Sequence, residues 1–468
     1  MSSFSGLSTA LSSLIAQRQA LDVAGQNIAN ANTVGYTRQR ADLTSVEGLA
    51  APSMYSAGLT TGNGVRVTGL TRSGDVFLDA RLRAETGGAS YSASRADTYS
   101  RLESTVAEPG DTGISNAMNE FWASWQDLGN SPGSDAARAV LLENATALAG
   151  RISSGYTGVT TQWAQSRAEL DTSVDEVNST ATVVAGLNAS IRGVLVTGGS
   201  ANELIDQRDV LVTRLSALIG ASGVQRDDGT LDVMVDGNAL VRGSKAQAIA
   251  VNTTSYTMGS PITLSWVGSG YALGATAGSI TGLVTALAPV ADGGILTSAA
   301  ASYDDLATRL ITKVNTQHAA SYTVAGVAGG AFFAATPPGA SSAATLSVAI
   351  TDTADIAVAA LGGGALDGSM ADAMAQIGAA QDSPDAAWST FVVNLGVASR
   401  SATQSATITE STRSTAEKLQ MSNASVDVDE ESVNMLAYQR AYEGAARVLT
   451  AIDSMLDTLI NRTGLVGR

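Results

Sequence analysis

The fold of this chain is decided by the stretch Met435-Leu436-Ala437-Tyr438-Gln439-Arg440-Ala441-Tyr442, which begins a long periodic segment near the C-terminus. Apolar side chains recur along that segment at alternating spacings of three and four residues: Met435, Tyr438, Tyr442, Ala445, Leu449, Ile452, Leu456 and Leu459. This heptad period places an apolar stripe along one side of a helix, and such a stripe needs a partner to bury it. The sequence therefore predicts a C-terminal helix with an assembly seam.

The N-terminal segment carries the same spacing, interrupted only at Arg18 and Gly25. Its seam positions are Phe4, Leu7, Leu11, Leu14, Leu21 and Ile28. We expect a helix from about Ser3 to Asn30 that ends in a turn over 32–36, because Asn and Gly tolerate the left-handed backbone angles on which helices end. The simplest partners for the two seams are each other, with copies of the same chain beside them.

One seam alone would favour an ordinary domain core, whereas two seams at opposite ends of the chain favour assembly. Burying one large apolar side chain contributes about 1.5–3 kcal/mol, so a whole seam offers on the order of 10 kcal/mol once a partner is present. Without that gain an isolated helix is marginal. We expect both ends to be mobile in the monomer and ordered in the assembly.

Composition bounds the classes of protein and partner. The 468 residues suffice for roughly two to four domains with ordinary cores. The formal net charge of −16 repels phosphate backbones and acidic headgroups, so we expect no nucleic acid and no membrane among the partners. The chain has no cysteine, which excludes disulfides, thiolate zinc sites and cysteine nucleophiles.

The start of the chain does not resemble a cleaved leader, because it lacks a basic region and its apolar residues follow helical spacing. Uncharged stretches at 246–291 and 319–351 are broken by Gly, Ser, Thr, Asn and Pro, so neither predicts a transmembrane helix. Absence of cysteine is common in bacterial proteins exported unfolded, and compositional drift explains it equally well. If the protein leaves the cell, we expect it to do so without a cleaved signal peptide.

Between the seams, helical and β signals alternate along the chain. Residues 37–84 predict an extended, partly β segment, and about 83–220 predict a helical bundle. The expected helices of that bundle are a short one ending at Gly129, a long one over about 134–196 with a break near Gly150 to Gly158, and one over about 201–219.

Turn signals predict β structure in the centre. Asp228-Gly229 and Asp236-Gly237 separate runs of alternating apolar residues, which predicts hairpins within 221–285. Later elements are a helix over about 296–321, a strand near 346–350, and a helix from about 386 to a turn at 425–429. Asp427 and Glu430 are spaced as the capping box of the final helix.

This nested order predicts an α+β multidomain fold, an elongated rod whose outer domains are inserted into a bundle formed by both ends of the chain. The predicted parts are a terminal α-helical coiled-coil domain (1–40 with 427–468), a helical bundle domain (41–220 with 296–322 and 386–426) and mainly-β outer domains (221–295 with 323–385).

Candidate chemistry is sparse. His318 is the only histidine, and in its polar helical stretch a surface or interdomain hydrogen bond is a better interpretation than catalysis. The acidic cluster Asp227, Asp228, Asp232 and Asp236 does not match the spacing of an EF-hand, and its Asp-Gly pairs are explained as turns.

Three further groups have ordinary interpretations. Gly362-Gly363-Gly364 lacks the strand and helix of a dinucleotide site and predicts a loop. Trp122 and Trp125 lie at helical spacing in an apolar face, which predicts core and not a sugar-stacking platform. Arg208, flanked by carboxylates, predicts either a buried polar link between helices or a solvated helix face. We therefore predict no catalytic, cofactor-binding or metal-binding residue, and no cofactor.

The run Asn27-Ile28-Ala29-Asn30-Ala31-Asn32-Thr33-Val34-Gly35-Tyr36-Thr37-Arg38-Gln39 resembles the N-terminal motif of the rod, hook and hook-associated group of bacterial flagellar axial proteins. The motif positions are Asn30, Asn32, Gly35, Tyr36, Arg38 and Gln39. The run from Asp429 to Tyr442 resembles the matching C-terminal motif, and the stretches 121–128, 206–209 and 315–318 are similar to parts of hook-associated members.

The resemblance implies a structural subunit and not an enzyme. Such proteins are exported unfolded through the flagellar type III channel, so we expect an extracellular location at the hook–filament junction. The terminal helices would form an inner coiled-coil tube. The implied partners are copies of the chain, the hook protein, hook-associated protein 3, and the export apparatus with its chaperone.

Two alternatives stay open at this point. A hook or distal-rod subunit would have the same ends and would form long tubes alone. A secreted enzyme or adhesin with oligomerising ends would show an activity that is lost when His318 is replaced.

Overall fold

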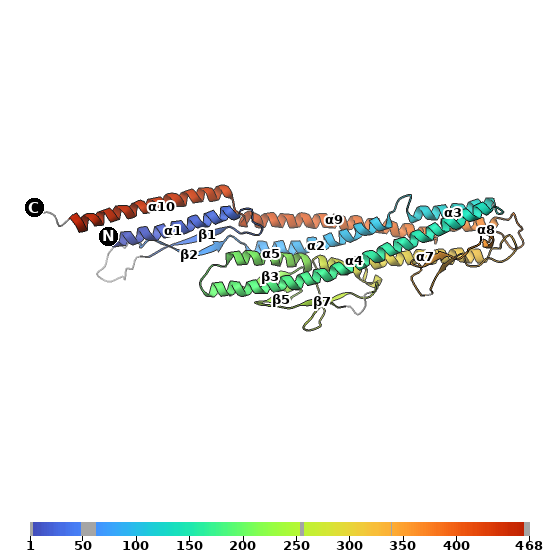
Figure 1. The fold of residues 1–468 in the computed structure, drawn as a ribbon, viewed down its shortest axis with the longest axis horizontal. Coiled ribbons are helices and arrows are strands. Elements are labelled where there is room, and N and C mark those ends of the chain that lie inside the picture. The colour runs from blue at the N-terminus through green and yellow to red at the C-terminus, as the bar shows by residue number, and fades with distance from the viewer. Residues whose placement is uncertain (1–2, 48–61, 253–256, 338, 463–468) are drawn as a thin grey trace, which may run out of the picture.

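The computed structural model describes residues 3–47, 62–252, 257–337 and 339–462. The molecule is a long rod, 64% helical, with small antiparallel sheets, as the predicted α+β class requires (Figure 1). Both ends of the chain lie at one end of the rod, where α1 (Ser3–Asn30) runs beside α10 (Val428–Asp457). We call these two helices the terminal pair and residues 76–424 the body.

Long helices build the body. They are α2 (Val76–Val106), α3 (Ile114–Asn130), α4 (Asp135–Val196), α5 (Asn202–Ile219), α6 (Ser279–Leu287), α7 (Ile295–Ala319), α8 (Ser369–Ala375) and α9 (Pro384–Ala424). Side chains of Asp75, Ser134 and Ser383 accept backbone N–H groups at the starts of α2, α4 and α9, which fixes where these helices begin. α2 runs along α9, and α4 spans most of the body (Figure 1).

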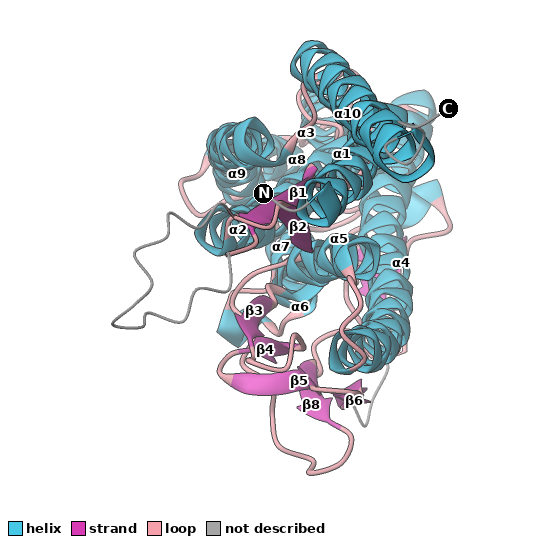
Figure 2. Ribbon diagram, turned by 90° about the vertical axis from the view of Figure 1, so that its left-hand side faces the viewer, coloured by secondary structure: helices cyan, strands magenta, loops and turns pink. Residues whose placement is uncertain are grey.

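Short hairpins complete the fold. β1 (Gln39–Ser45) pairs with β2 (Val65–Arg72) beside α1, with a bulge between Asp42 and Leu43. The other strands are β3 (Ser222–Gln225), β4 (Leu231–Val235), β5 (Asn238–Arg242) and β6 (Lys245–Ala246) in one sheet, β7 (Ile249–Asn252) with β8 (Thr263–Trp266), and β9 (Phe333–Ala335) with β10 (Leu346–Val348). β3 to β8 lie along α4 and α5 (Figure 2).

The two Asp-Gly turns form as predicted. Asp228-Gly229 connects β3 to β4, and Asp236-Gly237 connects β4 to β5. Asp236 and Gly237 have φ of 47° and 74°, the positive angles of a two-residue turn that matches strand twist.

The buried apolar cluster runs through the body from Leu102 to Leu395, and among the described residues it includes no member of the terminal pair. Its distal part is aromatic, with Phe121, Trp125 and Phe332 in mutual ring contact. By length and composition α4 could cross a membrane, but its buried face packs against α2, α3, α5 and α7, as the central helix of a bundle does.

The predicted break near Gly150 to Gly158 is wrong, because α4 is continuous. A Cβ at Gly155 would meet the ring of Tyr303 on α7, and one at Gly158 would meet Thr105 on α2. These glycines let neighbouring helices approach α4 closely and do not end it.

Three local predictions also need correction. The Asp75 cap begins α2 at Val76, inside the segment expected to be extended. α6 and α8 are helices in segments expected to be β or irregular. Only half of the capping box forms: Asp427 accepts from the N–H groups of Asp429 and Glu430, while the Glu430 carboxylate bonds to Arg38 instead.

Candidate functional site

The terminal pair holds the predicted seams, and most of their side chains lie half-buried between α1 and its neighbours. This applies to Leu7, Leu14, Leu21 and Ile28 on α1, and to Met435, Tyr438, Leu449, Ile452 and Leu456 on α10. Gly6 faces Ile452 so closely that a Cβ there would be 3.0 Å from its Cδ1. The two helices therefore contact each other within one chain, although the most buried apolar side chains of α1 are Ala16, Ala20 and Ala24 and not the predicted seam.

Other seam positions stay exposed. Leu11, Tyr442 and Leu459 are 51%, 42% and 55% exposed. Phe4 lies in α1, and its side chain is outside the described part of the structure. Contact between the two helices thus leaves part of each seam uncovered.

A second set of apolar side chains on α10 is exposed and is not part of the predicted heptad. Its members are Val433, Leu436, Val448 and Met455, each more than half exposed. Ile460, 74% exposed, lies in the π-helix Thr458–Arg462 that follows α10. Exposed apolar side chains gathered on one helix are typical of interaction sites.

A network of buried polar side chains joins the terminal pair to the body, and we call it the joint. At its centre Asn27 uses its whole amide: Nδ2 donates to the Gln39 carbonyl (2.8 Å) and to Oε2 of Glu431 (3.2 Å), and Oδ1 accepts from the Tyr36 hydroxyl (2.9 Å) and the Gln39 N–H (3.0 Å). A fully satisfied buried network fixes one geometry. Asn27 thereby locks α1, β1 and α10 together.

Arg38 closes the joint on the α10 side. Its Nε donates to Oε1 of Glu431 (2.7 Å), and its Nη2 lies 2.8 Å from Oε1 of Glu430. The Arg38 backbone N–H donates to the carbonyl of Ala424, the last residue of α9. Glu431 is only 3% exposed, so its charge depends on these donors.

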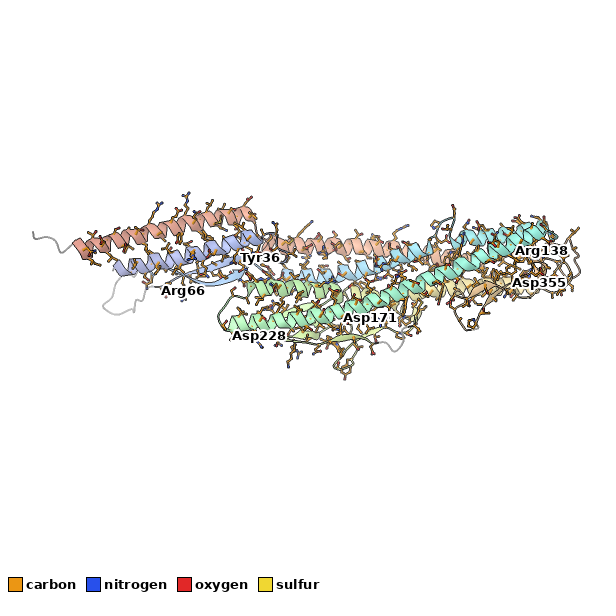
Figure 3. The ribbon with its side chains drawn as sticks, in the orientation of Figure 1. Tyr36, Arg66, Arg138, Asp171, Asp228 and Asp355 are labelled. Atoms are coloured by element: carbon orange, nitrogen blue, oxygen red, sulfur yellow. The ribbon has the colours of Figure 1, made fainter. Side chains whose placement is uncertain are left out.

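The turn between α1 and β1, which contains Tyr36 (Figure 3), packs against α5. The Thr37 N–H donates to Oδ2 of Asp206 (3.1 Å), and a Cβ at Gly35, whose φ is +79°, would meet Val210. Burial first, and then the charge of Asp206, raise the pKa of Tyr36 to about 12. Tyr36 therefore remains a hydrogen-bond donor at neutral pH.

An arginine–aspartate cluster continues the joint into the body. Arg72 at the end of β2 bridges Asp206 (2.7 Å) and Asp209 (3.1 Å) on α5. Asp209 also pairs with Arg83 of α2 (3.2 Å) and with Arg208 (3.3 Å). One carboxylate thus connects the β1–β2 hairpin, α2 and α5.

Of the motif residues chosen from the sequence, the structure brings Gly35, Tyr36, Arg38 and Gln39 into or against the joint. Asn30 instead makes local bonds within the α1 terminus, and Asn32 is exposed. The central residues Asn27 and Glu431 were not selected, because nothing in either local sequence indicates a partner hundreds of residues away.

Of the two interpretations of Arg208, the structure supports the buried polar link and not the solvated helix face. Arg208 is 2% exposed, it donates to the Gly229 carbonyl (2.9 Å), and burial lowers its pKa. His318 is fully buried and not at the surface. Its Nδ1 lies 2.7 Å from the Gly330 carbonyl, and its Nε2 accepts from the Ala357 N–H (2.9 Å). This pattern belongs to a neutral imidazole, and burial lowers its pKa.

The remaining candidates follow their ordinary interpretations. Trp122 and Trp125 are core residues, and Gly362 and Gly364 turn a loop with positive φ. Asp228 accepts from the Thr230 N–H and hydroxyl, as turn aspartates do. Among the described residues no group of three His, Cys, Asp or Glu side chains is arranged to hold a metal ion.

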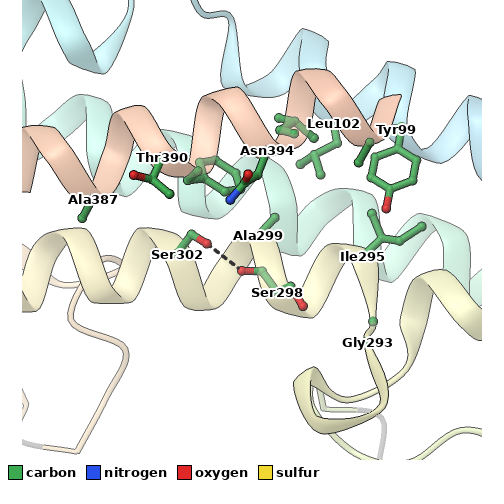
Figure 4. A pocket seen from close by; sticks show the side chains of 14 residues that line it. Tyr99, Leu102, Gly293, Ile295, Ser298, Ala299, Ser302, Ala387, Thr390 and Asn394 are labelled. Carbon is green, nitrogen blue, oxygen red and sulfur yellow. Dashed lines mark hydrogen bonds between the residues drawn. The ribbon is translucent and has the colours of Figure 1, made fainter. Parts of the chain in front are cut away.

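A groove of about 380 Å³ lies between α2, α7 and α9 (Figure 4). Its lining is small or apolar, with Ser298, Ser302, Thr390 and Asn394 as the polar exceptions and Tyr99 as the titratable one. Ser302 already donates to the Ser298 carbonyl. This lining offers no acid–base pair, so the groove does not alter the assignment of the candidate site to the terminal pair and the joint.

Comparison with known protein families identifies both regions. Residues 99–333 match the family described as "Flagellar hook-associated protein FlgK helical domain". Residues 7–37 match "Flagella basal body rod protein", and residues 419–462 match "Flagellar basal body rod FlgEFG protein C-terminal". The ends are therefore of a type shared with rod proteins, and the body is of the hook-associated type.

The chain is 30% identical over 505 residues to flagellar hook-associated protein 1 of Bacillus subtilis, covering 100% of both chains. It is 31% identical over 342 residues to the protein of that name in Escherichia coli, covering 71% of this chain and 60% of that one. The solved flagellar hook junction protein FlgK from Burkholderia pseudomallei shares the fold, with a TM-score of 0.63 at 16% identity over 73% of this chain and 100% of that chain. Full-length similarity and a matching body together mean that this chain belongs to the flagellar hook-associated protein 1 family, the structural proteins of the hook–filament junction.

Proposed function

We propose that the terminal pair is the element through which this junction subunit assembles, and that it joins the hook protein to hook-associated protein 3. The observation that carries the proposal is the set of apolar side chains left exposed on α10 after it has packed against α1, from Val433 to Met455. The terminal pair of a second copy is the simplest partner for that surface, because identical chains carry identical complementary surfaces.

The joint gives the proposed adaptor its rigidity. An adaptor between two flagellar segments must pass force from the terminal pair to the body without changing their angle. Asn27, Arg38 and Asp209 each bond to more than one element, and buried charge-assisted bonds hold geometry better than surface pairs do. This placement supports a joint that orients the pair.

We further propose export in an unfolded state, with delivery outside the cell and a chaperone that covers α10 beforehand. The support is chemical: the chain has no cysteine to oxidise or cross-link, and α10 carries exposed apolar side chains that would aggregate if uncovered. The three-part domain division given above remains part of this proposal.

The rod-type match of both ends keeps a hook or distal-rod subunit as the second candidate, whereas the body match favours the junction. The family consists of structural proteins of the flagellum. An enzymatic alternative has no observation in its favour.

Replacing Leu449 with Asp tests the assembly role. Leu449 is half-buried on α10 beside α1, so the charge should exclude the subunit from flagella and abolish swimming while the body melts as before. Val393→Asp, at a site on α9 that is already 60% exposed, is the matched control and should swim normally. Labelling with antibody and measuring the secreted protein separate failed assembly from failed export. Normal swimming by Leu449→Asp would refute the proposal.

A further inference from the structure

A groove beside the joint is not filled by any of the residues that the structure describes. It measures about 570 Å³ and lies between the α1–β1 turn, α4 and α5. Its apolar lining includes Val34, Val183 and Val210, which are 90%, 53% and 40% exposed. We call it the joint groove. Exposed valines converging on one hollow from three elements form a receptor for an apolar side chain.

An apolar knob lies in the first turn of α2. Phe77 is 87% exposed and Val76 beside it is 62% exposed. An aromatic ring this open gains several times more from burial than a scattered surface valine does, and buried aromatic anchors dominate protein interfaces. Arg81, one helical turn further on, is exposed next to Phe77.

The knob and the groove lie at one level of the rod and on opposite sides of it. Their level is the same because Arg72, just before the knob, pairs with Asp206, which lines the groove. The knob is on α2 and the groove is bounded by α4, and these two helices lie on either side of α5 (Figure 2). A knob and a groove placed in this way make a head-to-tail contact that rotation about an axis can repeat from copy to copy.

Charge favours the same pairing. Glu203 lines the joint groove and is exposed, whereas Arg81 accompanies the knob. In a chain with a net charge of −16, copies repel one another unless a contact brings opposite charges together.

We propose that Phe77 of one copy seats in the joint groove of the next copy, with Arg81 facing Glu203, as the lateral contact between neighbouring subunits. This inference rests on the proposed function, because it requires copies assembled side by side. It assigns a lateral contact to the start of α2 on one copy and to the α1–β1 turn, α4 and α5 on the next, separate from the seams of the terminal pair.

Cysteine cross-linking tests the contact, since the native chain contains no cysteine. Flagella are isolated from cells that produce the chain with Phe77→Cys and Val34→Cys, oxidised, and separated on a non-reducing gel. The contact predicts a ladder of multiples of the chain mass. The control pair Leu366→Cys with Val34→Cys should stay monomeric, because Leu366 is equally exposed at 87% but lies in the loop before α8.

Charge reversal provides the second arm. Arg81→Glu on the cross-linking background should lower the yield of the ladder by about tenfold, and adding Glu203→Arg should restore it.

Four results would overturn the contact. These are monomers from flagella that contain the variant, dimers from Phe77→Cys alone, cross-linked bands that are not multiples of the chain mass, and no effect of charge reversal. Monomers from a variant that is present at the junction would leave the proposed function standing. Complete absence of the native protein from flagella would refute both.

Discussion

The body and the terminal pair are both helical, yet they are stabilised in different ways. In the body, side chains such as Trp125, Leu148 and Val177 are completely buried within one apolar cluster. On α10, only Glu431 and Ala445 are buried, and larger apolar side chains remain in contact with water. The body thus buries a continuous apolar cluster within one chain, whereas α10 leaves most of its apolar side chains in contact with water.

The difference teaches that one chain can separate folding from assembly. The buried apolar residues that stabilise the monomer are concentrated between α2 and α9. The residues that we propose for assembly through the terminal pair lie in α1 and α10, and the joint connects the two sets.

The largest contrast should appear in local opening. Amides of the first 40 and last 40 residues should exchange with free energies below those of α4 by about 5 kcal/mol or more, because no described side chain of the terminal pair belongs to the buried apolar cluster of the body. Hydrogen exchange and limited proteolysis of the monomer measure this. Equal protection of α1 and α4 would remove the distinction between the two regions.

A core substitution should destabilise the body strongly. Trp125→Ala should lower the free energy of unfolding by about 3–5 kcal/mol, because it deletes a fully buried ring. Tyr442→Ala on α10 is the matched control, and in the monomer it should change stability by less than about 1 kcal/mol. Chemical denaturation followed by tryptophan fluorescence and circular dichroism compares them. Similar losses from both would mean that the terminal pair is part of the core.

The joint should show an intermediate effect. Glu431→Gln leaves Arg38 without its buried carboxylate and should destabilise the terminal pair by about 1–3 kcal/mol while sparing the body. Glu430→Gln, whose side chain is 54% exposed, should have less than about 1 kcal/mol of effect. Exchange rates in α10 report the change. Equal losses of stability from the two substitutions would mean that burial of Glu431 does not determine the stability of the joint.

The smallest effect concerns pH. Burial lowers the pKa of His318, so the folded body binds fewer protons there than the unfolded chain does. Its contribution is present above the unfolded pKa of about 6.5 and is lost progressively as pH falls below that value. Asp206, whose pKa burial raises, acts in the opposite sense at lower pH.

Thermal melts of the body at pH 7.5, 6.5 and 5.5 test this sign. His318→Gln removes the only histidine and should flatten the profile over that window. An unchanged slope in the variant would assign the pH dependence to carboxyl groups.

Local sequence patterns predicted what local physics controls. Heptad spacing marked α1 and α10 because a stripe on one helix face is a property of neighbouring residues. The Asp236-Gly237 turn was predictable because its positive φ angles select particular residue types. In both cases the cause lies within a few positions of the effect.

Features that depend on distant partners were missed. Gly155 looked like a helix breaker, and only the approach of Tyr303 explains why a glycine is tolerated there. For His318 the sequence predicted a surface or interdomain hydrogen bond but not its partners, which are the Gly330 carbonyl and the Ala357 N–H inside the body. Asn27 and Glu431 belong to motifs at opposite ends of the chain, and neither motif indicates that the two residues contact each other.

The bond between Asn27 and Glu431 spans 404 positions of sequence and encloses the whole body. Closing so long a loop is entropically unfavourable until the body has folded and brought the ends near each other. The joint is accordingly a late step in folding, and a chain that stops before α10 never completes it. Closure of the joint therefore requires both ends of the chain, and in a copy truncated before α10 the amide of Asn27 loses its bond to Glu431.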